Sequence, residues 1–507
     1  MTLTVFEGKE KHELKFKKGD TILTALQNGG IQSISAPCGG KGSCKKCSVN
    51  VISKEFSGTC LACTTEAKEG MTVELIPEER HSFADSSDAD VYEPTPGQSG
   101  YAVVCDIGTT VVVCQLLDLT DGRLLGRISG SNNQRIFGGD VLSRLKSAEE
   151  GHADEIHAQI VAQVDHYVEE LCTEAGIRLD EIAMMSVTGN TIMMHFFAGI
   201  NPAQLGTAPF QPVTLFGEMK DGKDIGLEYA GKVYLCPAVA GFMGSDVVCG
   251  LLSSGMAKAE GNTLMLDVGT NTEIVLGNRE HMFACSVDGG ATFRASLLEH
   301  GMTAREGAIA GVKHVDGGLD LKVLGSVAPE GICGSGFIDV LGIMFDEEIL
   351  DEMGHIVDPE ETESDLAKYI GEEEDRAVFY LTEDKKIFIS QVDISKFQMA
   401  KAAVSAGIDV LCEEAGTDVA SLDGLLLGGA FGAFVHRKNA ALLGVIPDEL
   451  LEKSEKLGNT ALAGAISAAV SEQARKDLEA LTARVQVVDM PTHPSFNDAF
   501  TDGMMFE

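Results

Sequence analysis

Four cysteines occur close together near the beginning of this 507-residue chain. Cys38, Cys44 and Cys47 lie on one glycine-rich loop, APCGGKGSCKKC, and Cys63 follows in LACTT. Three thiolates on one short loop, with a fourth further along the chain, can enclose the two iron atoms of a small iron–sulfur cluster. Glycines in the loop let backbone N–H groups approach the cluster sulfides, which stabilises an anionic cluster. We therefore expect electron transfer at these four residues.

Two features of this motif leave alternatives open. A structural zinc site is one alternative, because Cys44/Cys47 and Cys60/Cys63 form two C-x-x-C pairs of the kind that zinc uses. Zinc would leave Cys38 without a role, so we favour a 2Fe–2S cluster. The fourth ligand is also open between Cys60 and Cys63. We choose Cys63, because LACTT is similar to the segment that ends the cluster loop of many ferredoxins.

Composition excludes several classes of protein. A chain of 507 residues is too long for one core, and its hydrophobic content of 44% is ordinary for a globular protein. It has no apolar run long enough to cross a bilayer, its N-terminus is charged, and many of its 13 cysteines lie in apolar segments. These features predict a cytoplasmic protein without a membrane partner. The net charge is −38, so we also expect no nucleic-acid partner.

The chain divides into three regions of different character. Residues 1–77 show short period-two runs and a helical stretch over Thr21–Asn28, and with the cluster loop they resemble a plant-type ferredoxin, a β-grasp fold. This segment carries ten Lys and eight acidic residues, so nearly all of the negative charge lies further along. Residues 78–100 are polar and rich in Ser, Asp, Pro and Gly, which predicts a linker. Residues 101–507 alternate strand-like and helical patterns, so we expect an α+β multidomain protein.

A second motif occurs twice in the long C-terminal region. VVCDIGTTVVV contains Asp106 and MLDVGTNTEIV contains Asp267, each at the end of an apolar, strand-like run. An Asp at such a position can hold Mg²⁺ through water beside a polyphosphate. The glycine that follows permits a tight hairpin whose N–H groups bind phosphate oxygens, and threonine hydroxyls add hydrogen bonds. The repetition therefore predicts two phosphate-binding hairpins.

The repeat resembles the superfamily that contains actin, sugar and acetate kinases and the large heat-shock chaperones. That resemblance implies two ribonuclease-H-like lobes around ATP, at approximately 101–260 and 261–507. It implies that the first phosphate hairpin is formed by Asp106, Gly108, Thr109 and Thr110. The second phosphate hairpin would be formed by Asp267, Gly269, Thr270, Asn271 and Thr272. The adenosine site, in GLLLGGAFGAF, would be formed by Gly428, Gly429 and Gly432. Asp246, in GFMGSDVVCG, and Glu273 are further candidates, with Asp267, to orient a water for hydrolysis.

The fusion of a ferredoxin-like module to such an ATPase resembles one family, the reductive activators of corrinoid proteins. Further motifs carry the resemblance, among them GNTIMMHFFAG, GSDVV, GICGSG and GGAFG. The resemblance implies an enzyme that uses a 2Fe–2S cluster, ATP and Mg²⁺ to reduce an inactive Co(II) corrinoid protein to Co(I). It also implies a low-potential electron donor, such as a ferredoxin or flavoprotein, and a possible homodimer.

Two other functions remain as alternatives. One is a small-molecule kinase with a redox-sensing ferredoxin domain. The other is an ATP-dependent activator of a dehydratase or radical enzyme, a class that usually carries its cluster cysteines inside the ATPase body. Cys333, in GICGSG, is the residue that would favour this second alternative.

Overall fold

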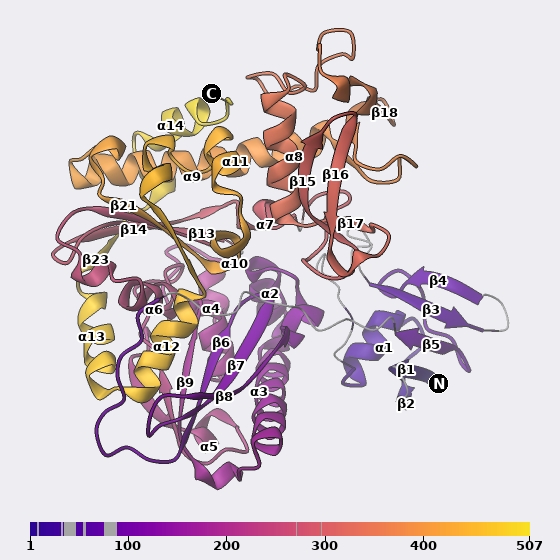
Figure 1. Ribbon diagram of the computed structural model, residues 1–507. Coiled ribbons are helices and arrows are strands. Elements are labelled where there is room, and N and C mark those ends of the chain that lie inside the picture. The colour runs from indigo at the N-terminus through magenta and orange to yellow at the C-terminus, as the bar shows by residue number, and fades with distance from the viewer. Residues whose placement is uncertain are drawn as a thin grey trace. The chain divides into compact units, whose positions relative to one another are not determined.

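The computed structural model, shown in Figure 1, describes the chain except for residues 8–9, 32–33, 35–46, 54–56, 76–88, 270, 296 and 507. The predicted ligands Cys38 and Cys44, the hairpin residue Thr270 and residues 78–88 of the predicted linker lie outside the described residues. The rest forms two compact units, which are Met1–Arg80 with Glu93–Ser245 and Ala468–Glu472, and His81–Tyr92 with Asp246–Ser467 and Gln473–Glu507. Within the part of the chain that is described, no helix has the length and hydropathy that crossing a membrane requires.

The N-terminal region is a five-stranded mixed sheet with one helix. Its strands, in the spatial order β2-β1-β5-β3-β4, are β1 (Thr2–Glu7), β2 (Glu10–Lys15), β3 (Ser48–Ile52), β4 (Ser57–Leu61) and β5 (Thr72–Leu75). Helix α1 (Ile22–Asn28) begins after Thr21, whose hydroxyl accepts a hydrogen bond from the Thr24 N–H at 3.1 Å. Alternate residues of β1, Leu3 and Val5, are fully buried. The expected ferredoxin-like fold is confirmed.

A six-stranded sheet follows in the first unit, in the spatial order β10-β11-β9-β6-β7-β8. Its strands are β6 (Tyr101–Ile107), β7 (Val111–Asp118), β8 (Leu124–Ser131), β9 (Ile182–Gly189), β10 (Glu218–Asp221) and β11 (Lys232–Leu235). β6, β7 and β8 are successive antiparallel neighbours, whereas β9 pairs in parallel with β6 and with β11. The helices of this region are α2 (Val141–Ser147), α3 (Ala153–Ala175), α4 (Thr191–Phe197) and α5 (Gly222–Ile225).

The second unit contains a sheet in which five strands repeat the arrangement of the first sheet, while the sixth strand lies at the opposite edge. Its order is β22-β21-β12-β13-β14-β23, formed by β12 (Thr263–Val268), β13 (Asn271–Gly277), β14 (Met282–Asp288), β21 (Gly424–Gly428), β22 (Ser454–Gly458) and β23 (Val485–Val487). β12, β13 and β14 are antiparallel, and β21 pairs in parallel with β12 and β22. In both sheets the first strand of an antiparallel run therefore lies beside parallel strands. This duplication confirms the two ribonuclease-H-like lobes.

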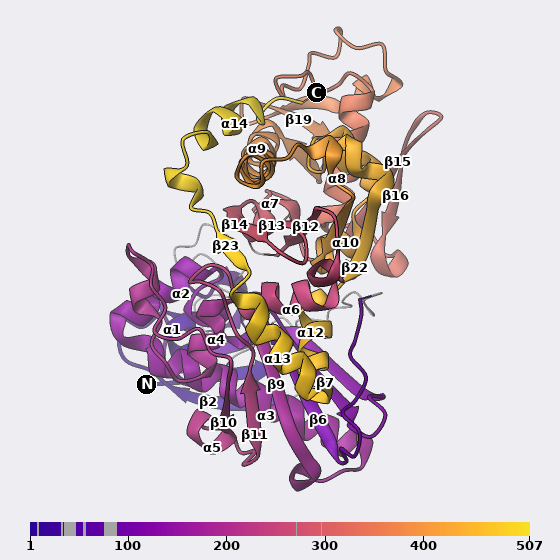
Figure 2. The ribbon, with the colours of Figure 1, turned by 90° about the vertical axis from the view of Figure 1, so that its left-hand side faces the viewer.

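Helices and two small sheets complete the second unit. The helices that begin after Gly244 are α6 (Ser245–Ser253), α7 (Gly290–Phe293), α8 (Gly334–Asp346), α9 (Gln391–Ala415), α10 (Gly429–Phe434), α11 (Arg437–Leu442), α12 (Thr460–Val470), α13 (Glu472–Thr482) and α14 (Phe496–Asp502). The small sheets comprise β15 (Ala308–Val315), β16 (Gly318–Val323), β17 (Gly331–Ile332), β18 (Ile370–Glu373), β19 (Arg376–Tyr380) and β20 (Phe388–Ser390). Figure 2 shows α9 nearly end-on beside β13 and β14, which it contacts.

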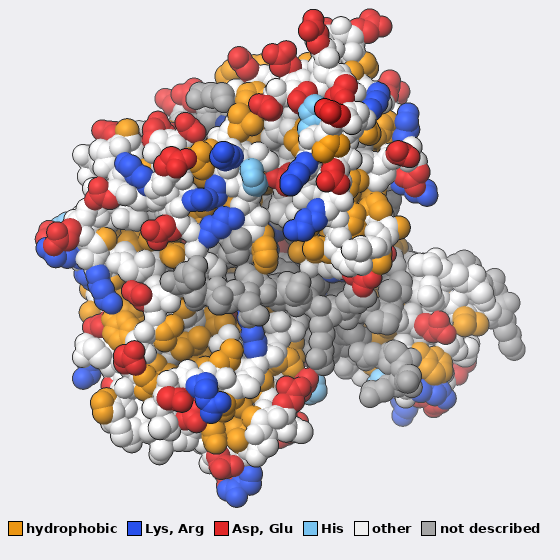
Figure 3. Space-filling view, viewed as in Figure 1, with side chains coloured by type: hydrophobic (Ala, Val, Ile, Leu, Met, Phe, Trp, Pro, Cys, Tyr) orange, Lys and Arg blue, Asp and Glu red, His pale blue; other side chains and the backbone are white. Residues whose placement is uncertain are grey.

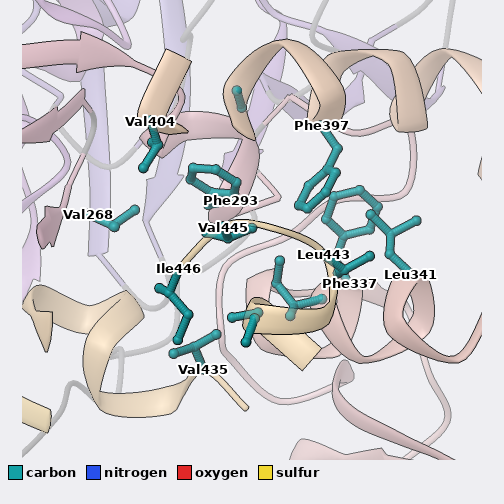
Figure 4. Packing of buried hydrophobic residues seen from close by; sticks show 14 of the residues in the cluster. Val268, Phe293, Phe337, Leu341, Phe397, Val404, Val435, Leu443, Val445 and Ile446 are labelled. Carbon is teal, nitrogen blue, oxygen red and sulfur yellow. The ribbon is translucent and has the colours of Figure 1, made fainter. Parts of the chain in front are cut away.

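The core of the second unit is built around aromatic rings. The Phe397 ring packs edge-on against Phe293 and Phe337, with centroid distances of 5.7 and 5.8 Å. Figure 4 shows these rings among the aliphatic side chains of the same core, including that of Val268. Val268 is 2% exposed and is the last residue of β12, so this packing fixes the end of the strand that carries Asp267.

One expected helix is interrupted. The sequence over residues 140–175 shows a single amphipathic pattern, but the structure has α2, a π-helical turn at Ala148–His152 and then α3. Gly151 has φ +104, a value that an L side chain rarely adopts, and this residue produces the break. The acidic stretch over 346–376 is mostly irregular, but it is more than a surface insertion, because four of its apolar side chains are buried in the core of the second unit: Ile349, Leu350, Ile356 and Leu366. Figure 3 shows acidic side chains spread over the visible surface with fewer basic ones among them, in keeping with the net charge.

Candidate nucleotide and cluster sites

The first phosphate hairpin joins β6 to β7. Asp106 lies near the end of β6, and the Gly108 N–H donates to the Val111 carbonyl oxygen at 2.9 Å, which closes the turn. A Cβ atom at Gly108 would lie 2.8 Å from that same oxygen, so a side chain there would push the turn open. Thr109 and Thr110 occupy the tip of the hairpin, as the motif predicts.

The end of the neighbouring strand β9 supports this hairpin. Asn190 Nδ2 donates to Thr109 Oγ1 at 3.0 Å, while Asn190 Oδ1 accepts from the Met193 N–H at 3.0 Å and caps α4. A Cβ atom at Gly189 would lie 2.5 Å from the Ile107 carbonyl oxygen, so the two strands approach closely only because this residue is glycine. The parallel pairing of β6 and β9 thus places Asn190 where its side chain can hold the Thr109 hydroxyl in position.

The second phosphate hairpin joins β12 to β13 in the second unit. Register places Asp267 opposite Glu273 and Val268 opposite Thr272. Asp267, Gly269 and Asn271 are partly exposed, whereas the Thr272 side chain is fully buried. Contact of a phosphate with the Thr272 hydroxyl therefore remains a prediction, and it would require local rearrangement.

The glycine-rich segment predicted to bind adenosine lies against Asp267. β21 runs parallel to β12 with Gly428 opposite Asp267. A Cβ atom at Gly429 would lie 2.5 Å from Asp267 Oδ1, and one at Gly428 would lie 3.3 Å from Oδ2. Gly432 is buried in α10, where a Cβ atom would lie 2.4 Å from the Leu427 carbonyl oxygen. Gly428 and Gly429 thus border the Asp267 carboxylate, while Gly432 allows α10 to approach β21.

Three carboxylates influence one another around the second hairpin. Burial raises the pKa of Glu273 well above its usual range, and the negative charges of Asp246 and Asp267 raise it further. Ser286 Oγ donates to Glu273 Oε1 at 3.2 Å, which opposes that rise. Burial lowers the pKa of Arg294, while Glu273 and Asp267 raise it. The structure therefore brings Asp246, Asp267 and Glu273 together and adds Arg294, which the motifs had not indicated.

Two of the four predicted cluster ligands lie in the described residues. Cys47 is fully buried, Cys63 is 7% exposed, and both belong to the core of the ferredoxin-like region. The Ala62 N–H donates to the Cys47 carbonyl oxygen at 2.8 Å, so the residue preceding Cys63 is hydrogen-bonded to Cys47. Cys60 lies in β4 opposite Val49 and is less buried. Two buried cysteines whose backbones lie close together fit a cluster site, and Cys63 as the fourth ligand remains a prediction.

Cys333, the cysteine that would favour a dehydratase or radical-enzyme activator, is 3% exposed. It precedes α8, and its Sγ atom lies 3.5 Å from Ser335 Oγ. A buried thiol in this position does not suit a cluster shared across a protein surface.

Comparison with known proteins identifies the domains of the chain. Three family models match consecutive parts of the chain: a 2Fe-2S iron-sulfur cluster binding domain at residues 6–76, the RACo middle region at 101–259, and the C-terminal domain of RACo, the ASKHA domain, at 261–507. The corrinoid activation enzyme RamQ of Eubacterium limosum is 31% identical over 418 residues, which cover 80% of this chain and 70% of RamQ. The chain belongs to the RACo family.

Other RACo relatives extend the likeness to the whole fold. A [Co(II) methylated amine-specific corrinoid protein] reductase of Methanosarcina barkeri is 22% identical over 449 residues, or 80% of this chain and 78% of that protein. The solved structure of a reductive activator for corrinoid, iron-sulfur protein covers 100% of this chain and 98% of its own, with a TM-score of 0.72 and 26% identity. A 2Fe–2S cluster and ATP are therefore cofactors of this RACo protein.

Proposed function

We propose that this protein reduces the inactive Co(II) state of a corrinoid protein to Co(I) in an ATP-dependent reaction. The observation that carries the proposal is the joining of a ferredoxin-like domain and a two-lobed ATPase in one chain. Relatives with the same domains are named corrinoid activation enzyme and Co(II) corrinoid protein reductase. The proposed reaction needs both domains, because it combines electron transfer with the use of ATP.

The energetics of the reaction explain why both domains are needed. Plant-type 2Fe–2S centres have potentials of about −400 mV. In a one-electron transfer, the equilibrium constant falls tenfold for each roughly 59 mV by which the acceptor potential lies below the donor potential. Co(I) corrinoids are strongly reducing, so the transfer runs uphill without a second source of free energy. ATP supplies that source in this proposal without phosphorylating an acceptor.

Different residues of this chain would bind the cluster, the phosphates, Mg²⁺ and the adenosine. Cys38, Cys44, Cys47 and Cys63 would hold the 2Fe–2S cluster, which supplies one-electron carrier chemistry when bound. The backbone of the two hairpins would bind the phosphates of ATP. Asp106 and Asp267 would hold Mg²⁺ through water, and Asp246 with Asp267 would orient the water that hydrolyses ATP. Gly428, Gly429 and Gly432 would border the adenosine.

ATP would act by biasing a conformational equilibrium of the two lobes. A ligand shifts such an equilibrium only by the difference between its affinities for the two states, so ATP and its products must differ in the contacts they make. The conformation favoured by ATP would bind the corrinoid protein in a form that is easier to reduce. Trapping of the Co(I) product would have the same effect on the equilibrium.

Three further features belong to the same proposal. The electron donor would be a low-potential protein such as a ferredoxin or flavoprotein, because the donor must match the cluster potential. The protein would act in the cytoplasm, where thiols stay reduced. It would form a homodimer through the ATPase lobes.

The test is reduction of a Co(II) corrinoid protein under anaerobic conditions. The purified protein is mixed with ATP, a strong one-electron reductant and a corrinoid protein encoded near its gene, and the Co(I) absorption is followed. We expect conversion that requires ATP and is lost in both Cys47→Ala and Asp267→Ala. Phosphoryl transfer from ATP to sugars or carboxylic acids, without any Co(I), would instead support the kinase alternative and reject this proposal.

A further inference from the structure

Arg144 is a fully buried cation beside the first phosphate hairpin. It lies in α2 and is 0% exposed. Its Nη2 donates to the Thr109 carbonyl oxygen at 2.5 Å, its Nε donates to the Gly138 carbonyl oxygen at 2.9 Å, and its Nη1 lies 3.3 Å from Gln134 Oε1 and 3.0 Å from Met193 Sδ. All of these acceptors are neutral.

A buried guanidinium is ordinarily paired with a carboxylate, because an unpaired charge in the interior is costly. Burial lowers the pKa of Arg144 to about 9, which Asp140 opposes, so the side chain stays protonated at neutral pH. Within the described part of the chain no carboxylate lies within ion-pair distance of Arg144. Among the residues that the structure describes, this charge therefore has no carboxylate partner, although it lies beside residues expected to bind an anion.

Asn132 acts on the neighbouring peptide groups of the same hairpin. Its Nδ2 donates to the Gly108 carbonyl oxygen at 2.8 Å, and its backbone N–H donates to the Thr110 carbonyl oxygen at 2.8 Å. Asn132 is 0% exposed, and its Oδ1 accepts from the Gln134 N–H at 2.9 Å. Three successive hairpin carbonyls are therefore held by Asn132 and Arg144.

Because the peptide bond is planar, these contacts also determine the direction in which the hairpin N–H groups point. In a trans peptide, the C=O of one residue and the N–H of the next point in opposite directions. Because the carbonyls of Gly108 and Thr109 point toward Asn132 and Arg144, the N–H groups of Thr109 and Thr110 point to the opposite side. Successive N–H groups presented on one side form a concavity that binds anions.

We propose that Arg144 and Asn132 are positioning residues for nucleotide phosphates. They fix the peptide planes of the first hairpin so that the Thr109 and Thr110 amides face the phosphates, and Arg144 places a positive charge behind those amides. The chain thereby gains affinity for a polyphosphate rather than for the nucleoside. This inference depends on ATP binding at the first hairpin and not on the identity of the protein that receives the electron.

The test compares nucleotides that differ in phosphate number. Dissociation constants of ATP, ADP and AMP are measured by calorimetry on the full-length protein and on Arg144→Met, which keeps much of the volume and removes the charge. We expect ATP and ADP to bind at least tenfold more weakly to Arg144→Met, with a much smaller change for AMP. Arg144→Lys, which restores the charge without the planar fork, should recover part of the loss.

Leu145→Ala is the matched control for loss of stability. Leu145 is the next residue of α2 and is 1% exposed, so its truncation loosens the same helix without touching the hairpin. It should lower Tm while leaving the ratio of ATP to AMP affinity unchanged. If Arg144→Met does not fold, Asn132→Ala is measured in the same way, with the same preferential loss expected for ATP.

Equal weakening for all three nucleotides, or ATP affinity within about twofold of the wild type, would overturn the inference. These measurements use no corrinoid protein, so their outcome is independent of the Co(II) assay. A protein that fails that assay but shows the phosphate-dependent loss would keep Arg144 in this role and reject only the proposed reaction.

Discussion

Gly429 offers the sharpest test of the placement of Asp267. The residue has φ +70 in the left-handed region, and an added Cβ atom would lie 2.5 Å from Asp267 Oδ1. Gly429→Ala therefore combines two effects, which are backbone strain and displacement of a carboxylate. Because ordinary contact begins at 3.4 Å, the carboxylate must retreat by about 0.9 Å.

The two effects differ in what they change. An L residue in the left-handed region costs roughly 1–2 kcal/mol of unfolding free energy. Misplacing a reacting group by about 1 Å can lower turnover by roughly 100-fold, which corresponds to about 2.7 kcal/mol in the barrier. We therefore expect Gly429→Ala to lower stability modestly and the kcat for ATP hydrolysis by roughly two orders of magnitude.

Gly416→Ala is the control that isolates strain. Gly416 follows α9 with φ +62, and nothing lies within 4 Å of an added Cβ atom. Its stability loss should match that of Gly429→Ala to within about 1 kcal/mol, because both share the same backbone cost, while its ATP turnover should stay at the wild-type level. Chemical denaturation and a steady-state ATPase assay measure both quantities. Turnover by Gly429→Ala within about threefold of Gly416→Ala would refute the reasoning, since Asp267 would then tolerate displacement or take no part in hydrolysis.

Three further predictions address other groups. Cys47→Ala should abolish the visible absorption and the reduced electron-spin signal of the cluster but leave ATP turnover intact, and Asp267→Ala should do the reverse; loss of both properties in either variant would contradict separate sites. Because the pKa of Glu273 is raised, ionisation of this group destabilises the fold, so the stability advantage of Glu273→Gln should grow as pH rises above about 4.3 toward the raised value. A difference in unfolding free energy that is flat with pH would exclude that coupling. His314 lies 2.7 and 2.8 Å from two carboxylates, those of Glu347 and Asp365, and its pKa is raised, so the protection it gives should be complete below about pH 6.5 and lost at higher pH. Hydrogen exchange of β15 and β16 in His314→Gln should then match the wild type at high pH but exceed it at low pH.

The sequence indicated the features that depend on local pattern. The Asp-x-Gly-Thr motif needs only a strand end and a tight turn, so Asp106 and Asp267 could be placed on hairpins from their neighbours alone. The recurrence of that motif predicted two hairpins, and the duplicated lobes were implied by the resemblance to the actin and sugar kinase superfamily. The interruption of the helix at Gly151 was missed because the hydrophobic periodicity continues through it.

Features that depend on pairing between distant segments could not be predicted in this way. Gly428 and Gly429 meet Asp267 only because β21 pairs with β12, and an isolated glycine-rich segment does not show what it packs against. Arg144 occurs in VLSRLKS, where a surface position is the ordinary expectation for an arginine. Its burial follows from the way α2 packs against the first hairpin.

The two hairpins share a sequence motif but lie in opposite electrostatic surroundings. Behind the first lies the buried guanidinium of Arg144, whose hydrogen-bond partners are neutral. Around the second, burial and the negative charges of Asp246 and Asp267 raise the pKa of Glu273, and Arg294 is the opposing charge. Anions favour the first environment, whereas a divalent cation would relieve the repulsion in the second. The two hairpins therefore differ in the charges that surround them, a difference that the matching motifs alone did not reveal.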